Sequence, residues 1–184
     1  MKDRTEIEYG RYKIIAGTLN GNIKAVALFG KSKIDEAQGQ SIDSVIVKIK
    51  EILDRIERER ASQRRAPHIG TVEEYKEAIE HISMSSAERL MITSHAISVD
   101  RKMTAAELAK AGEYDSYSTA NSIYGTLAKK IGNWIGLAAK DSEIRSNDVT
   151  FTFYLAEGEY NDADNWVWIM HPEVHEALSL LNMV

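Results

Sequence analysis

The chain of 184 residues contains no cysteine. This absence excludes disulfide bridges, a thiol nucleophile and cysteine-ligated zinc, and it fits a reducing compartment. The sequence also lacks an apolar segment near its start and an uncharged apolar run of about 18 residues, the length that a membrane-spanning helix needs. We therefore expect a cytoplasmic protein that makes no contact with a membrane.

Basic residues are outnumbered by acidic ones. Lys and Arg total 23 against 28 Asp and Glu, which gives a formal net charge of −5. This balance argues against a protein that coats nucleic acid through bulk charge, although local basic patches remain possible. Because 43% of the residues are hydrophobic, the chain has enough apolar material for a packed core, and disorder is excluded.

Residues 1–60 are predicted to form a β-β-β-α domain. Three short strands separated by turns are expected from Tyr9 onward, and Asn20-Gly21 between the first two, which are apolar, is a strong hairpin signal, because both residue types tolerate positive φ. From Ser41, a natural N-cap, apolar residues recur at three- and four-residue spacing as far as Ile56. This pattern predicts a three-stranded meander followed by an amphipathic helix.

Residues 61–82 are predicted to be a linker and a connecting helix. The apolar period stops near Ala61, and Pro67 and Gly70 lie in the stretch that follows. Thr71 and Glu74 then have the spacing of a capping box, in which each side chain bonds the other residue's backbone N–H. We expect a short helix to begin there.

Residues 83–184 are predicted to form a winged helix-turn-helix domain, so that the whole chain belongs to the α+β class. A capping box at Ser85 begins one helix, and another at Thr104 begins a helix that stops at Gly112. Ser118 is expected to cap a long helix that ends near Leu137. Two capped helices around a short turn with glycine are typical of a helix-turn-helix.

The wing of this domain is predicted to be a hairpin. Residues 149–155 alternate apolar and polar side chains, which indicates a strand, and a second strand, Trp166–Met170, follows a polar loop. Pro172 then has the place of a first-turn proline in a closing helix.

The exposed face of the long helix carries the predicted DNA-binding residues. Small polar side chains near its start allow close approach to a groove and can bond base edges, while lysines can meet phosphates. Two cations ahead of the helix-turn-helix are further candidates for phosphate contacts. The predicted contacts are Ser118, Asn121, Ser122, Thr126, Lys129, Lys130, Arg101 and Lys102.

Residues 85–184 resemble the winged helix-turn-helix module of bacterial proteins associated with restriction and phage defence. In that module a Thr-x-x-Glu-Leu-Ala helix precedes an Ala-Asn-x-x-Tyr-Gly helix. The matching positions here are Thr104, Glu107, Leu108, Ala120, Asn121, Tyr124 and Gly125. The resemblance implies a nucleic-acid-binding accessory module, and it supplies no catalytic residue.

Residues 9–60 resemble the HicB-like partial double-stranded-RNA-binding fold. The resemblance is carried by the order of the elements and by the segment QGQSIDSVIVKIKEIL, in which a polar turn leads into a helix. HicB-like proteins often join such a unit to a DNA-binding tail and sequester a small toxin. The resemblance therefore implies partner capture or dimerisation by this unit.

Three further patterns have a structural and a functional interpretation. Residues 25–32 match a permissive phosphate-binding loop but read as a strand, so nucleotide hydrolysis is not expected. His171 and His175 are four residues apart, but no third ligand is apparent and no metal is predicted. The arginines of residues 55–65 alternate with glutamates, which favours a solvated helix end over contact of Arg60, Arg64 and Arg65 with phosphates.

From these patterns we expect a non-enzymatic protein that needs no cofactor and binds double-stranded DNA as a homodimer. Its expected role is that of a regulator or accessory factor in bacterial or phage defence. The alternative is a factor that binds a protein, and inhibits or regulates a defence enzyme, through the same winged helix. The net acidity favours this alternative slightly. A basic surface beside Ser122 and Lys129 would favour DNA.

Overall fold

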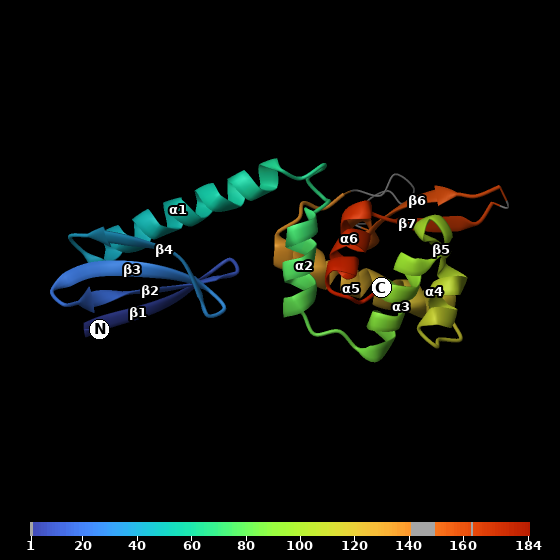
Figure 1. The fold of residues 1–184 in the computed structure, drawn as a ribbon, viewed down its shortest axis with the longest axis horizontal. Coiled ribbons are helices and arrows are strands. Elements are labelled where there is room, and N and C mark those ends of the chain that lie inside the picture. Colours follow the sequence, from blue (N-terminus) through green and yellow to red (C-terminus); the bar gives the residue numbers. More distant parts are fainter. Residues whose placement is uncertain (1, 141–149, 163) are drawn as a thin grey trace. The chain divides into compact units, whose positions relative to one another are not determined.

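The computed structural model describes residues 2–140, 150–162 and 164–184. The chain is divided into two compact α+β units, Met1–Gln63 and Arg64–Val184, which we call the N-terminal unit and the C-terminal unit (Figure 1). Each unit has its own cluster of buried apolar side chains. In the described ranges, no helix combines the length and the apolar character that crossing a membrane requires.

The N-terminal unit begins with a four-stranded antiparallel meander. Its strands pair in chain order and are β1 (Lys2–Tyr9), β2 (Tyr12–Leu19), β3 (Asn22–Phe29) and β4 (Ser32–Gly39). The prediction of three strands was wrong, because β1 was missed. This strand lies at the sheet edge, and most of its side chains are exposed and polar, so it lacks the apolar alternation that marks a half-buried strand.

The turn between β2 and β3 and the helix that follows the sheet confirm two predictions. Asn20 and Gly21 have φ values of 51° and 79°, the left-handed conformation that a tight hairpin needs. Helix α1 (Ile42–Ser62) begins after Ser41, whose side chain accepts a hydrogen bond from the Ser44 N–H. The helix packs on one face of the sheet, and alanines on β2, β3 and β4 leave room for its buried side chains.

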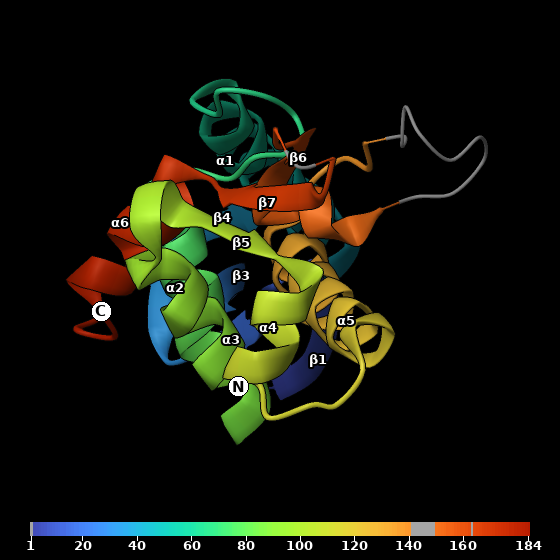
Figure 2. The same ribbon diagram turned by 90° about the vertical axis from the view of Figure 1, so that its right-hand side faces the viewer.

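The C-terminal unit combines five α-helices, within the described residues, with a three-stranded antiparallel sheet. The helices are α2 (Val72–His81), α3 (Ser86–Ile97), α4 (Ala105–Ala111), α5 (Tyr117–Ile135) and α6 (Pro172–Leu180). The strands are β5 (Lys102–Thr104), β6 (Ala156–Tyr160) and β7 (Trp166–Met170), with two 3-10 turns, η1 (Val99–Arg101) and η2 (Phe151–Tyr154). Strand β7 lies between β5 and β6 (Figure 2).

The predicted helix starts of this unit are confirmed except one. Thr71, Ser85 and Thr104 each form the complete capping box, and Pro172 occupies the first turn of α6. The prediction that Ser118 caps α5 was wrong. The helix begins two residues earlier, because the Ser116 side chain accepts the hydrogen bond from the Thr119 N–H.

The predicted hairpin between residues 149 and 170 was half correct. Strand β7 is confirmed, but the alternating segment before it forms the 3-10 turn η2, and β6 begins only at Ala156. Val149, the first residue of the predicted strand, lies outside the described residues. Thr152 and Tyr154, predicted to be the solvent-facing side of a strand, are both buried, so the alternation does not reflect a half-buried strand.

Candidate nucleic-acid interface

Helices α4 and α5 are joined by a short turn and pack against each other. One face of α5 is fully buried and carries the apolar side chains that anchor it in the C-terminal unit. These residues are Ala120, Tyr124, Leu127, Ala128 and Ile131, all 0% exposed. The opposite face is therefore held at the surface in a fixed orientation.

The exposed face of α5 carries four of the predicted residues in one row, which we call the polar stripe: Ser118, Ser122, Thr126 and Lys129. All four are exposed, and Asn121 beside them is half-buried. Their spacing of three or four residues places them on one side of the helix. The Thr126 hydroxyl donates to the Ser122 carbonyl at 2.8 Å. Since none of the 19 residues of α5 is acidic, nothing on the stripe repels an anion.

A buried hydrogen-bond network holds α5 against α3 and β7. His95 Nδ1 lies 2.7 Å from the Tyr124 hydroxyl, and His95 Nε2 lies 3.0 Å from the Trp168 carbonyl. Because a carbonyl can only accept, Nε2 carries the proton and Nδ1 accepts from Tyr124. Burial lowers the pKa of His95 to about 4, so the imidazole is neutral at pH 7.

The C-terminal end of α5 is fixed by a buried ion pair. The Arg64 guanidinium contacts the Glu74 carboxylate through two hydrogen bonds of 2.9 and 2.7 Å, and the Glu74 side chain is 1% exposed. Arg64 also donates to the carbonyls of Ile135 and Gly136, which α5 leaves unsatisfied at its end. The hydrogen bonds of Arg64 therefore fix the C-terminal end of α5 within the unit. Arg65 likewise pairs with Glu173, at 2.9 Å.

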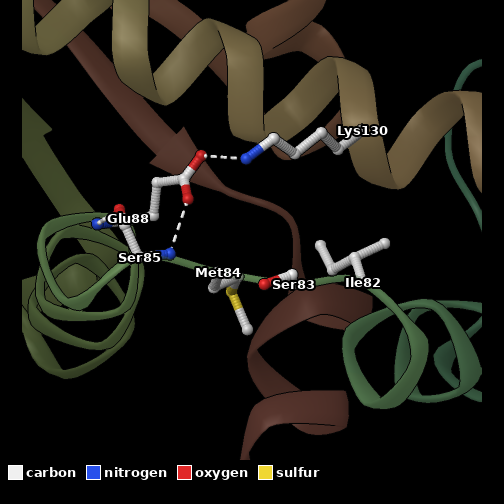
Figure 3. A pocket seen from close by; sticks show the side chains of 6 residues that line it. All are labelled: Ile82, Ser83, Met84, Ser85, Glu88 and Lys130. Atoms are coloured by element: carbon white, nitrogen blue, oxygen red, sulfur yellow. Dashed lines mark hydrogen bonds and ion pairs between the residues drawn. The ribbon is translucent and has the colours of Figure 1, made fainter.

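Lys130, a predicted phosphate contact, is engaged within the chain. Its Nζ lies 2.6 Å from a carboxylate oxygen of Glu88, in a hollow of about 630 Å³ beside the segment that joins α2 and α3 (Figure 3). Burial would raise the pKa of Glu88, but hydrogen bonds from Lys130 and Ser85 outweigh it and keep the pKa below its ordinary value. Lys130 therefore neutralises a buried carboxylate.

The other predicted cations differ in their availability. Lys102 pairs with Glu159 of β6 at 2.8 Å, and Arg101 is half-buried in a left-handed backbone conformation, with φ 56°. Lys129 Nζ lies 4.5 Å from the centre of the Phe151 ring, and the side chain is exposed. Of these cations, Lys129 is thus the one placed on the exposed face of α5 without an acidic partner among the described residues.

The structure adds residues to this surface that the pattern of the sequence did not single out. Tyr117, the first residue of α5, is 66% exposed, and a large aromatic side chain before a run of small polar ones was the available signal. Carboxylates lie on either side of the stripe in sequence: Glu113 and Asp115 precede α5, and Asp162 and Asp164 lie in the loop between β6 and β7. The polar stripe is therefore a carboxylate-free strip in an acidic unit.

The remaining sequence patterns have structural explanations. The loop-like segment of residues 25–32 forms most of β3 and the turn into β4. His171 Nε2 lies 2.9 Å from the Phe153 carbonyl, and no group of three potential ligands for a metal ion occurs in the parts of the chain that the structure describes. Comparisons of the chain with protein-family models, with curated proteins and with solved structures found no match.

Proposed function

We propose that the C-terminal unit is a winged helix-turn-helix that binds duplex DNA through the polar stripe of α5. The observation that carries the proposal is the exposed face of α5, which has no carboxylate over 19 residues and is lined by small polar side chains. The order α3, β5, α4, α5, β6, β7, with β7 between β5 and β6, is the order of a winged helix and supports the proposal.

The first turns of α5 would lie in the major groove. Ser118, Asn121 and Ser122 carry the donors and acceptors that read base edges, and their small size permits close approach. Lys129, two turns further along, would meet a phosphate. Lys130 and Lys102 would reach phosphates only by leaving Glu88 and Glu159, so we assign them a smaller share of the affinity.

The N-terminal unit would support this activity by dimerisation or partner capture, and the protein would act as a regulator or accessory factor in bacterial or phage defence. This part of the proposal rests on the resemblance of residues 9–60 and 85–184 to HicB-like and defence-associated modules. A homodimer would present two copies of α5 to a two-fold symmetric site, which is how helix-turn-helix proteins reach specific affinity.

The test is binding of the full chain to random-sequence duplexes at 50 and 200 mM salt, measured by fluorescence anisotropy. Lys129→Ala should weaken binding and reduce the slope of log affinity against log salt by about 1, the share of one phosphate contact. Lys76→Ala, which removes the same charge from α2 between Glu73 and Glu80, is the matched control. An unchanged slope in Lys129→Ala, or no binding even at 50 mM salt, would contradict the proposal.

A second candidate function is binding of a protein partner through the same surface. It is favoured by the charge of the C-terminal unit, in which 11 Lys and Arg face 18 Asp and Glu, and by the pairing of Lys102 and Lys130 within the chain. A partner interface would be insensitive to the loss of Lys129 and would be weakened by Tyr117→Ala, because exposed tyrosines contribute strongly to protein interfaces.

A further inference from the structure

The N-terminal unit has a cationic groove, well separated in sequence from the helix α5. It is a hollow of about 400 Å³ between α1 and the edge strand β4. Its lining residues, which define the cationic groove, are Ala37, Gln38, Lys48, Glu51, Ile52, Arg55 and Arg58.

Three cations face a single carboxylate in this groove. Lys48, Arg55 and Arg58 lie on one side of α1, at three- and seven-residue spacing, and Glu51 lies between the first two. Both arginines are exposed. Among the described residues, neither of them forms an ion pair, whereas Arg64 and Arg65 are both paired with glutamates. The groove therefore has uncompensated positive charge.

Strand β4 gives the cationic groove an open backbone edge. Strand β4 is the last strand of the sheet, so its outer edge pairs with no strand of the described chain. The Gln38 carbonyl accepts a hydrogen bond from Lys48 Nζ at 3.2 Å, so the groove's cations reach the backbone of β4. Ala37 and Ile52 add apolar surface between the edge and the arginines.

We propose that the cationic groove binds an extended acidic peptide segment of a partner protein, which adds as a fifth strand beside β4. Main-chain hydrogen bonds along the edge would supply affinity, and acidic side chains of alternate residues would pair with Arg55 and Arg58. A nucleic acid fits less well, because it would leave the open edge of β4 unused. On the opposite edge strand, β1, Arg4 is already paired with Glu6.

The test uses the full chain and three labelled ten-residue peptides, with affinities measured by fluorescence anisotropy. The first alternates Glu and Val, the second alternates Gln and Val, and the third is the first with two of its valines replaced by Pro, so that it keeps all its glutamates. We expect the first to bind, with the affinity falling as salt rises. The second should not bind detectably, because it has no charge to pair with the arginines. The third should bind at least tenfold more weakly than the first, because proline removes strand hydrogen bonds.

Variants then locate the site. Arg55→Gln with Arg58→Gln should weaken the binding of the Glu-Val peptide about tenfold, the loss of two charge-assisted contacts. The matched control, Lys2→Gln with Arg4→Gln, removes two charges from the opposite edge of the same sheet and should leave the affinity unchanged. Amide shifts on binding should be largest along residues 32–39.

Four results would overturn the proposal. The first two are no binding of the Glu-Val peptide at millimolar concentration, and binding of the proline peptide as tight as that of the Glu-Val peptide. The third is an equal loss of affinity in both double variants, and the fourth is displacement of the peptide by a single-stranded oligonucleotide at an equal concentration of charge. Because none of these measurements involves α5 or duplex DNA, the outcome is independent of the function proposed for the C-terminal unit.

Discussion

The two units differ most in charge and in how they use it. The N-terminal unit has 12 Lys and Arg against 10 Asp and Glu, a net charge of +2, whereas the C-terminal unit has 11 against 18, a net charge of −7. In the acidic unit, α5 is nevertheless free of carboxylates. In the basic unit, the cations beside β4 are concentrated on one side of α1. The sign of a unit's net charge therefore does not predict the local charge of each of its surfaces.

The units also differ in what they bury. The C-terminal unit has the ion pair of Arg64 and Glu74 and the network around His95 in its interior. In the N-terminal unit, the pair of Arg11 and Glu57 lies at the rim of the core, where the Glu57 side chain is 34% exposed. Buried ionic and polar groups stabilise only while every partner is present. We therefore expect the C-terminal unit to be the more sensitive to single substitutions and to pH.

The largest predicted effect compares two arginines. Arg64→Ala should lower the free energy of unfolding of the C-terminal unit by about 3–5 kcal/mol, because Glu74 would remain buried without its cation. Arg11→Ala should cost the N-terminal unit about 1–2 kcal/mol, because water can reach Glu57.

Urea unfolding followed by amide resonances of each unit measures both costs in the full chain. All three tryptophans lie in the C-terminal unit, so their fluorescence offers a second signal for that unit alone. If Arg64→Ala and Arg11→Ala lower the free energy of unfolding equally, the deeper burial of Glu74 does not make its ion pair more important for stability.

The next effect is on pH dependence, since all five histidines lie in the C-terminal unit. The folded unit holds His95 neutral with a pKa of about 4, whereas the unfolded chain takes up the proton near pH 6.5. The unfolded state thus binds more protons between these values, and stability falls as the pH falls from 6.5 to 4, by about 3 kcal/mol. Burial lowers the pKa of His171 too, which adds in the same direction.

Thermal unfolding at pH 7.0, 5.5 and 4.5 measures this loss, with tryptophan fluorescence reporting on the C-terminal unit and amide resonances on the N-terminal unit. His95→Gln should be less stable at pH 7 but should lose less stability on acidification. The N-terminal unit contains no histidine, so its stability should change little above pH 5. An acid response of the same size in both units would rule out the histidine explanation.

The smallest predicted effect concerns the loop between β6 and β7. Asp162→Asn with Asp164→Asn should raise the affinity for duplex DNA about threefold at 50 mM salt, because two charges that repel phosphates are removed. Asn also tolerates the left-handed backbone of Asp164, with φ 58°. Glu80→Gln with Glu176→Gln, on α2 and α6, is the control of equal charge. A rise of the same size in the control would assign the effect to net charge alone.

Local signals in the sequence predicted much of the fold. The N-caps at Thr71, Ser85 and Thr104 were found because a cap and its partner are three residues apart, and Ser41 was found because a serine precedes the apolar period of α1. Strand β1 was missed because an exposed edge strand has little apolar pattern to detect. The error at η2 has the opposite cause: both faces of this segment are buried, so the apolar-polar alternation had no structural meaning.

The candidate interface was predictable in part. The spacing of Ser118, Ser122 and Lys129 placed them on one face, as the structure has them. The ion pairs of Lys130 with Glu88 and of Lys102 with Glu159 join residues 42 and 57 positions apart, and only the tertiary fold brings them together. Short-range patterns could therefore locate the surface but could not show which cations were already engaged.

The most direct test of the account is a titration of the isotope-labelled full chain with a duplex at 50 mM salt, recording the amide resonances of both units. We predict that the largest shifts occur in the first turns of α5, around Ser118 and Ser122, although this unit carries the net charge of −7. Shifts confined to the cationic groove of the N-terminal unit, or no shifts at all, would contradict it.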